Sequence, residues 1–288
     1  MAKLRVPVFS IEAFGRHTAD FYANTFSDHL RNHHFIKKVH KHDFYITVLF
    51  TKGTGTHEID FSNYPVKPGR VFFLSPGQMH NWKFSNDIEG LIFFHSAAFF
   101  ELYFPGKSIR DFAFFSSVNT IPYIDLDKKS MSGISGAMRS ILEEYTLRYS
   151  MWTEKAAALM LLTYVDLGRI YKSTKKVNSS SGYLDKFRKF EALVDSYYKK
   201  TKSPLAYAEM MSMTEKHLNR ICRECVNKTT GQIISERVLM EAKRLLTHKS
   251  ASVSGVADEL GFDDKAYFSR LFRKHEGLTA MAFSKKYR

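Results

Sequence analysis

The sequence predicts an α+β protein of two domains, with a β-rich N-terminal part and an all-α C-terminal third. Three observations support this class. Short β-branched and aromatic segments separated by turn residues fill residues 35–100, apolar residues at helical spacing follow from about residue 130, and two similar helix–turn–helix segments occupy the C-terminal third. At 288 residues, the chain is long enough for two hydrophobic cores.

Composition narrows the class of partner. The net charge is +14 and the pI is near 9.6, which favours a polyanion, nucleic acid before an anionic membrane. Residues 183–288 hold 21 Lys and Arg against 13 Asp and Glu, so the excess is denser at this end. The chain shows neither the apolar segment of a signal peptide nor the roughly 18 apolar residues of a spanning helix, and we therefore expect a cytoplasmic protein without membrane contact.

Residues 1–130 are expected to form the β-rich domain. Its candidate strands are apolar segments at 44–50, 57–61, 71–74 and 91–94, and Gly, Pro, Asn and Ser separate them. Short strands at such regular spacing are typical of a small sandwich or barrel. Phe and Tyr are frequent in these segments, so we expect them to line its interior.

Residues 131–172 predict two amphipathic helices with a break near Ser150. One apolar stripe runs through Ile134, Met138, Ile141, Leu142 and Tyr145, and a second, with one acidic member, through Leu159, Leu162, Val165, Asp166 and Ile170. These helices either pack on the β-domain or carry a dimer interface, and we favour the second, which makes a homodimer. Residues 173–184 are rich in Ser, Thr and Lys and predict a flexible linker.

Residues 185–288 are expected to be helical throughout. Pro204 suits the first turn of a helix, Thr214 can cap the helix that follows, and Asn227 and Gly277 stand where each repeat must leave its second helix in a left-handed conformation. A helix over 231–247 joins the repeats. Its inward residues are expected to be Ile234, Val238, Ala242 and Leu245.

The two repeats align residue by residue. Ala208 corresponds to Ala257, and the segment 217–223 corresponds to 267–273. Leu218 and Ile221 in the first copy, and Phe268, Leu271 and Phe272 in the second, are expected to face the core. The two cysteines, Cys222 and Cys225, have no second pair to complete a zinc site, and Cys222 takes the apolar position of Phe272.

The remaining polar positions of the second helices predict contacts with double-stranded DNA. Arginine can bind guanine through two hydrogen bonds in the major groove, asparagine can do so with adenine, and lysine and serine reach bases or phosphates. The candidate DNA-binding residues are Lys216, Asn219, Arg220, Arg223, Lys265, Ser269, Arg270 and Arg273. The alternative is that these side chains only face solvent or pair with Asp263 and Asp264; Arg220 and Arg270 could equally hold a phosphate or a carboxylate.

From about Tyr183 to Arg288 the chain resembles the DNA-binding domain of the AraC/XylS transcription regulators. The resemblance rests on Gly261-Phe262-x-Asp264-x-x-Tyr267-Phe268-Ser269-Arg270-x-Phe272-Arg273-Lys274-x-x-Gly277. Two positions depart from the family pattern, which has Pro where this chain has Ala280 and Arg where it has Ser284. We expect the first departure to loosen a helix start and the second to remove a phosphate or scaffold contact.

The resemblance implies a cupin-like β-barrel in the N-terminal domain that binds a small effector. His40-x-His42, Gly53-x-Gly55, Gly69 and Pro76-Gly77-Gln78-x-His80 resemble the cupin pattern. Metal-binding cupins have a Glu after the HxH pair with three or four residues between, where this chain has Ile46 and Thr47. We therefore expect neither a metal nor another cofactor; weak metal binding by the three histidines is the alternative. The histidines are instead expected either at the pocket mouth as neutral hydrogen-bonding groups or as structural residues. The candidate effector-binding residues are His40, His42, Tyr45, His80 and Trp82.

Together these features predict a transcription regulator whose binding to promoter DNA is modulated by a small molecule, with RNA polymerase as a further candidate partner. A metal-dependent cupin enzyme with a DNA-binding tail is the alternative. The missing Glu disfavours it, and we expect no enzyme activity. A third possibility is an architectural nucleic-acid protein without any ligand.

Overall fold

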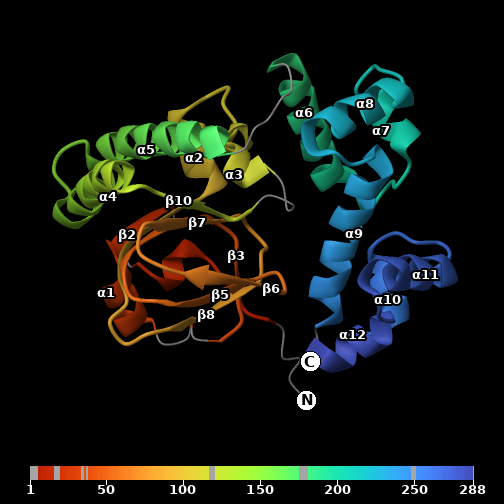
Figure 1. The fold of residues 1–288 in the computed structure, drawn as a ribbon, viewed down its shortest axis with the longest axis horizontal. Helices are drawn as coiled ribbons and strands as arrows, with labels where there is room; N and C mark the ends of the chain where they lie inside the picture. The colour runs from red at the N-terminus through yellow and green to blue at the C-terminus, as the bar shows by residue number, and fades with distance from the viewer. Residues whose placement is uncertain are drawn as a thin grey trace. The chain divides into compact units, whose positions relative to one another are not determined.

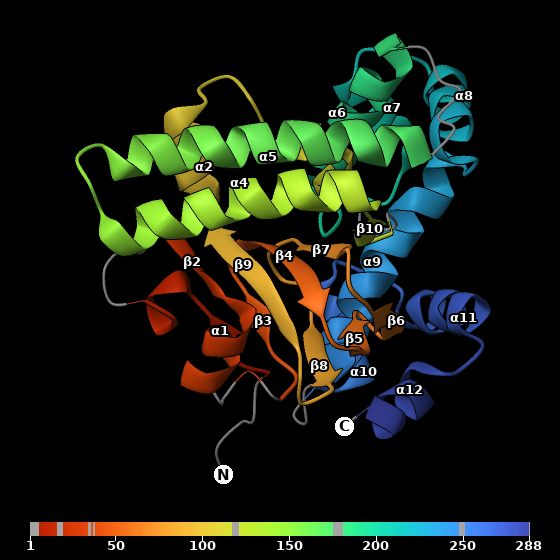
Figure 2. The same cartoon turned by 60° about the vertical axis from the view of Figure 1, so that its left-hand side comes forward.

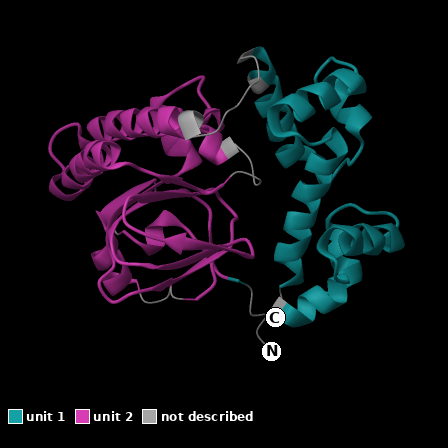
Figure 3. Ribbon diagram, viewed as in Figure 1, with its two compact units in different colours: residues 1–6, 177–288 teal, residues 7–176 magenta. Residues whose placement is uncertain are grey.

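The structure, a computed structural model, describes residues 6–15, 20–33, 36, 38–116, 121–174, 181–247 and 251–287. The chain divides into two compact units, Pro7–Lys176 and Val177–Arg288 together with Met1–Val6 (Figure 3). The first unit consists of strands covered by helices, and the second is helical (Figure 1). The predicted α+β class is therefore confirmed.

The strands of the first unit form two larger sheets and a short pair, and an isolated β-bridge between His40 and His80 links the short pair to the three-stranded sheet. A five-stranded sheet has the order β10-β7-β4-β9-β2, a three-stranded sheet the order β6-β5-β8, and β1 pairs with β3. The strands are β1 (Val8–Phe9), β2 (Phe21–Thr25), β3 (Lys41–His42), β4 (Tyr45–Lys52), β5 (Gly55–Ile59), β6 (Ser62–Val66), β7 (Arg70–Leu74), β8 (His80–Phe84), β9 (Glu89–His95) and β10 (Tyr123–Asp125). The predicted β-rich, cupin-like character of this domain is confirmed.

Strand β4 lies at the centre of the five-stranded sheet, between β7 and β9. Val48 of β4 pairs with Phe72 of β7 and with Ile92 of β9. Ile46, Val48 and Phe50 belong to an apolar cluster with residues of the three-stranded sheet, whereas Tyr45 and Leu49 belong to a second cluster with the helices. Successive side chains of a strand point to opposite faces, so both faces of this sheet are buried.

Helices cover the outer face of the large sheet. The longest of them, α4 (Lys128–Leu147) and α5 (Trp152–Thr174), lie side by side across the strands (Figure 2). The predicted stripe of α4 is buried here, with Ile134, Met138 and Ile141 at most 4% exposed. Shorter helices complete the unit: α1 (Phe26–Asn32), α2 (Ala97–Tyr103) and α3 (Ala113–Ser116). The break expected near Ser150 is present, because α4 ends at Leu147 with Arg148 in the left-handed region.

A buried polar network ties α5 to the sheet. The hydroxyl of Tyr164 lies 3.1 Å from Oγ1 of Thr47 on β4 and 2.9 Å from Nε2 of His95 on β9, and all three side chains are at most 1% exposed. His95 Nδ1 lies 2.9 Å from the carbonyl oxygen of Ser96. Burial lowers the pKa of His95 to about 4, so its imidazole is neutral at physiological pH.

The second unit is a chain of helices. They are α6 (Ser181–Tyr197), α7 (Pro204–Met210), α8 (Glu215–Val226), α9 (Thr230–Leu246), α10 (Val253–Glu259), α11 (Lys265–Glu276) and α12 (Ala280–Tyr287). The expected linker over 173–184 is shorter at both ends, because α5 continues to Thr174 and α6 begins at Ser181; residues 175–180 lie outside the described residues. Among the described helices of both units, none is long and apolar enough to cross a membrane.

Helix α9 connects the two repeats and contacts the helices around it. It begins with a capping box that the sequence analysis missed, in which Thr229 accepts from the N–H of Gln232 and the Gln232 side chain accepts from the N–H of Thr229. Arg237 pairs with Asp195 of α6 at 2.6 Å. Of the four predicted inward residues, Ile234, Val238 and Ala242 are buried, whereas Leu245 is half-buried and its neighbour Leu246 is buried instead.

Tyr164→Phe should destabilise the first unit by about 1–3 kcal/mol, because it leaves the buried His95 and Thr47 side chains without this partner. Both tryptophans of the chain, Trp82 and Trp152, belong to this unit, so urea unfolding followed by tryptophan fluorescence reports on it alone. Tyr149→Phe is the control, since Tyr149 is 60% exposed, and should stay within about 0.5 kcal/mol of the wild type. Equal unfolding midpoints for both variants would contradict the role given to the network.

Candidate functional site

The two predicted repeats, α7–α8 and α10–α11, have the same turn geometry. Ser212 and Gly261 both have positive φ, at 52° and 70°. The residue after each, Met213 or Phe262, donates its N–H to an alanine carbonyl five residues earlier, at 3.0 Å in both repeats. The tandem helix–turn–helix arrangement read from the sequence is therefore confirmed at the level of single hydrogen bonds.

The second helix of each repeat is anchored by apolar side chains. In α8, Leu218, Ile221 and Cys222 are fully buried, and in α11 Phe268 and Phe272 are. Leu271, which aligns with Ile221 and was also predicted to face the core, is only half-buried. Burial raises the pKa of the Cys222 thiol to about 12, so this cysteine is a neutral core residue, as its alignment with Phe272 predicts.

The ends of these helices also behave as predicted. Thr214 accepts a hydrogen bond from the N–H of His217, and Asp264 accepts from two N–H groups at the start of α11. Both helices end in the left-handed region, at Asn227 with φ 55° and at Gly277 with φ 69°. Each second helix is thus fixed at both ends, which sets the direction of its exposed side chains.

Those exposed side chains form a basic stripe on each second helix. Lys216, Arg220 and Arg223 follow one another four and three residues apart, so they share one face of α8. In α11 the exposed Arg270 and Arg273 share one face in the same way, whereas Lys265, five residues before Arg270, is exposed on another side of the helix. An exposed row of guanidinium and ammonium groups on a second helix is suited to the phosphates and base edges of a DNA major groove.

Several of these cations have acceptors of their own. Arg270 lies 3.3 Å from Asp264, and Lys265 lies 3.0 Å from Asp258, with all four side chains more than half exposed. The guanidinium of Arg220 lies 2.9 Å from Nδ1 of His217. Exposed ion pairs contribute only about 0–1 kcal/mol each, so a phosphate or a base edge can replace these partners.

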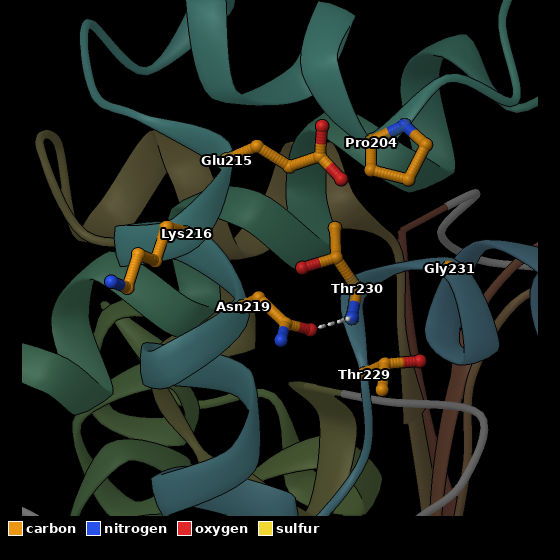
Figure 4. A pocket seen from close by; sticks show the side chains of 7 residues that line it. All are labelled: Pro204, Glu215, Lys216, Asn219, Thr229, Thr230 and Gly231. Atoms are coloured by element: carbon orange, nitrogen blue, oxygen red, sulfur yellow. Dashed lines mark hydrogen bonds between the residues drawn. The ribbon is translucent and has the colours of Figure 1, made fainter.

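Asn219 and Ser269 differ from the other candidates because their polar atoms are used inside the fold. The amide oxygen of Asn219 accepts from the N–H of Thr230 at 3.1 Å and so joins α8 to the start of α9 (Figure 4). The hydroxyl of Ser269 donates to the carbonyl of Lys265 at 3.0 Å. These bonds give both residues a scaffold role, and base reading by them stays a prediction.

A pocket of about 450 Å³ opens where α7, α8 and α9 begin (Figure 4). The side chains of Lys216 and Asn219 line it together with Pro204 and Glu215, and Thr229, Thr230 and Gly231 close it from the start of α9. The sequence does not predict this pocket, since its residues come from three segments that show no common motif. Lys216 and Asn219, two of the predicted DNA-binding residues, thus share this pocket with the start of α9.

In the first unit, four of the five candidate effector-binding residues lie together. His40, His42, His80 and Trp82 are between 1% and 8% exposed, and they lie inside the sandwich rather than at a pocket mouth as predicted. The fifth candidate, Tyr45, does not lie with them as predicted. It lies on the other face of β4, in the helix-side core cluster, where its ring stacks on His95 with centroids 5.3 Å apart.

The buried histidines are held close to one another. Nε2 of His42 lies 2.5 Å from Nε2 of His80, and Nδ1 of His80 lies 3.1 Å from Nε2 of a further residue, His57, which the sequence analysis did not select. Burial lowers the pKa values of these three histidines well below the usual range, and it lowers that of His40 as well. The expectation of neutral imidazoles agrees with this direction.

Comparison with known families gives a match in each unit. An AraC-like ligand binding domain matches residues 24–128, and a helix-turn-helix domain matches residues 207–286. The chain belongs to the AraC family of transcription regulators. It therefore joins a ligand-binding N-terminal domain to a helix–turn–helix DNA-binding domain.

Similar proteins include other AraC-family regulators. The HTH-type transcriptional activator RhaR of Escherichia coli is 24% identical over 247 residues, which cover 83% of this chain and 84% of RhaR, and RhaR of Shigella flexneri matches to the same extent. Among solved structures, ToxT of Vibrio cholerae with a bound unsaturated fatty acid is 13% identical with a TM-score of 0.42, over 93% of this chain and 95% of ToxT.

The two departures from the AraC-family pattern are accommodated inside the fold. Ala280 is 3% exposed and opens α12, whose first turn is capped by the Thr279 hydroxyl accepting from the N–H of Ala282 at 3.1 Å. Ser284 is 4% exposed and donates its hydroxyl to the carbonyl of Leu246, the last residue of α9, at 2.9 Å. Ser284 thus supplies a scaffold contact where the sequence analysis expected one to be lost.

Lys202, between α6 and α7, connects the two repeats of this AraC-family domain. Its ammonium donates to the carbonyls of Leu260 and Gly261 in the turn of the second repeat, both at 2.6 Å, and to that of Lys199 at 3.0 Å. A Cβ on Gly261 would overlap the Lys199 carbonyl oxygen, so the segment packs directly on this turn. In the sequence Lys202 is one of several lysines in a polar loop, and no local signal identifies it.

Lys202→Met should loosen the second repeat, because it removes three charge-assisted hydrogen bonds while keeping the apolar stem. Such bonds contribute about 1.5–3 kcal/mol, so we expect amide hydrogen exchange in α10 to become roughly tenfold faster or more. Lys200→Met is the control, because this substitution removes the same charge from a nearby exposed residue. If both variants exchange like the wild type, Lys202 does not hold the turn.

Proposed function

We propose that this AraC-family chain is a sequence-specific regulator whose two repeats bind successive major-groove segments of promoter DNA, and whose DNA affinity changes when the N-terminal domain binds a small molecule. The observation that carries the proposal is the pair of matched turns, each followed by a helix with an exposed basic stripe. Because α9 and Lys202 connect the repeats, we expect the two half-sites to be read at one fixed spacing, about one turn of DNA apart.

Selection of binding sites from random DNA by the full chain tests sequence specificity. The expected outcome is enrichment of sites with two conserved blocks about 10 base pairs apart, at a moderate salt concentration that weakens non-specific binding. Absence of any enriched sequence would refute the sequence-specific regulator, and would leave an architectural role. The selected DNA then serves for the variants below.

Arg273→Ala and Arg223→Ala should each weaken binding to the selected DNA by about 1–3 kcal/mol, or roughly 5- to 150-fold, because each residue ends an exposed basic stripe. Gel-shift titration across a salt series gives both the affinity and its salt slope. A residue that reads a base relaxes preference at one position, whereas a residue that binds phosphate lowers the salt slope by about one. Arg31→Ala is the matched control, since the Arg31 side chain is 73% exposed on α1 in the other unit. Wild-type affinity for both DNA-unit variants would contradict this interface.

The input is proposed to be a ligand of the N-terminal domain that stabilises one arrangement of the regulator over another. Such a ligand shifts the equilibrium only by the difference between its affinities for the two arrangements. A ligand that reaches His42, His80 and Trp82 has to enter between the sheets, because these side chains are at most 8% exposed. We assign this domain a binding role rather than catalysis.

The output is proposed to be activation, in the cytoplasm, with RNA polymerase as the protein partner. RhaR, which matches most of this chain, is named a transcriptional activator. A reporter gene placed behind the selected DNA site distinguishes the two directions of control, since an activator raises expression above that of the bare promoter.

We also propose a homodimer that forms through α5. The second predicted stripe of this helix is only partly covered in the first unit. Leu162 is 61% exposed and Val165 is half-buried, whereas Leu159 and Ile170 are half-buried against the helix-side core. Large apolar residues exposed along one helix are typical of an interface. The exposed acidic residue Asp166 lies within the same stripe.

Leu162→Lys should reduce dimerisation at least tenfold, because it places a charge at the centre of this stripe. Light scattering after size exclusion, over a concentration series, gives the dissociation constant. Leu102→Lys is the control, since Leu102 is 73% exposed on α2. If the Leu162 variant has the dissociation constant of the wild type, the dimer interface does not include this stripe.

A further inference from the structure

We propose that His40, His42 and His80 form a buried binding site for one divalent transition-metal ion of the zinc class. These three side chains place one potential ligand atom each within 4.8 Å of one another, and all three are at most 4% exposed. The proposal goes beyond the regulator function, and it adopts the metal site that the sequence disfavours because no Glu follows the HxH pair.

The backbone holds two of these ligands side by side. His40 and His80 form an isolated β-bridge, in which His40 N–H donates to the His80 carbonyl at 3.2 Å and His80 N–H donates to the His40 carbonyl at 3.0 Å. His42 lies two residues after His40 in β3, so its side chain returns to the same face. Strand pairing therefore positions all three imidazoles without any contribution from an ion.

Outer hydrogen bonds leave the correct nitrogens available. His40 Nδ1 lies 2.7 Å from the carbonyl oxygen of Lys38, to which it can only donate, so Nε2 of His40 keeps its lone pair. Nδ1 of His80 lies 3.1 Å from Nε2 of His57, so donation to His57 leaves Nε2 of His80 as the ligand. A second ring nitrogen bonded to an acceptor is the usual arrangement of metal-binding histidines.

The cluster without an ion leaves polar atoms unsatisfied. Nε2 atoms of His42 and His80 lie 2.5 Å apart, where one proton at most fits between them. Nδ1 of His42 and Nδ1 of His57 are buried with no hydrogen-bond partner in the described part of the chain. A cation placed among the three Nε2 atoms uses their lone pairs. Two nitrogens about 2.1 Å from a tetrahedral ion lie roughly 3.4 Å apart, so the His42–His80 pair has to open by about 1 Å.

The donor set determines the class of ion. Three imidazoles without a carboxylate favour zinc, nickel, copper or cobalt and disfavour magnesium and calcium, which prefer oxygen ligands. Three protein donors also leave one tetrahedral position for water or for a donor atom of an effector. That last use rests on the proposed ligand-binding role of the domain, whereas the ion site itself does not.

Titration of the untagged, chelator-treated full chain with zinc, and with cobalt as a spectroscopic probe, tests the site. The wild type should bind one equivalent with the visible absorption of a tetrahedral cobalt site. His42→Gln and His80→Gln should each weaken zinc binding at least tenfold, while His275→Gln, at an exposed position of α11, should not change it. The proposal is overturned if the wild type binds no ion, or if the His42 and His80 variants bind zinc as tightly as the wild type does.

His57→Gln addresses the case in which a ligand variant does not fold. This substitution keeps an amide beside His80 without supplying a ligand, and loss of an outer-shell partner typically weakens metal binding about 10- to 100-fold. The His57 ring stacks on Trp82 with centroids 3.3 Å apart, so zinc should also change the fluorescence of Trp82 in a Trp152→Phe background. Zinc that binds without altering Trp82 emission, with full affinity in the His57 variant, would place the ion elsewhere. DNA-site selection is measured separately, so failure here leaves the regulator function untouched.

Discussion

Both faces of strand β4 are buried, and much of the N-terminal unit follows from that constraint. A sheet with two apolar faces has to be covered twice. The three-stranded sheet covers one face and the helices α4 and α5 cover the other. Helix α5, on which Leu162 is exposed, therefore lies in the outermost layer of the unit, and the histidine cluster lies in the layer between the two sheets.

The same constraint explains why the polar groups of this unit occur in bonded sets. Thr47, His95 and Tyr164 lie in the helix-side layer, and His40, His42, His57 and His80 lie in the layer between the sheets. A buried polar group is costly unless it has a partner. The first set is satisfied by its own members and by the carbonyl of Ser96, whereas the second leaves two ring nitrogens without a hydrogen-bond partner among the described residues.

In the DNA-binding unit, periodicity and capping residues predicted the two repeats and most of their cores, although Leu245 and Leu271 are only half-buried and the capping box of α9 was not predicted. Thr214, Asn227 and Cys222 behave as their residue types require, because these effects act over a few neighbouring residues. The contacts of Lys202 and Ser284 span 58 and 38 residues, and no local pattern records them. The clustering of the histidines was only partly predictable. The HxH pair and His80 were selected, but Tyr45 was grouped with them, because the sequence does not show which face of β4 it occupies. His57 carries no motif and was missed for that reason.

The contact of Lys202 with the second turn makes the two repeats unequal. The first turn accepts a serine, whereas the second requires glycine, because the Lys199 carbonyl occupies the space that a side chain would need. A segment that precedes the first repeat thus completes the second. The copies are therefore no longer modules that could be exchanged or inherited separately, and a substitution tolerated in one repeat need not be tolerated at the aligned position of the other.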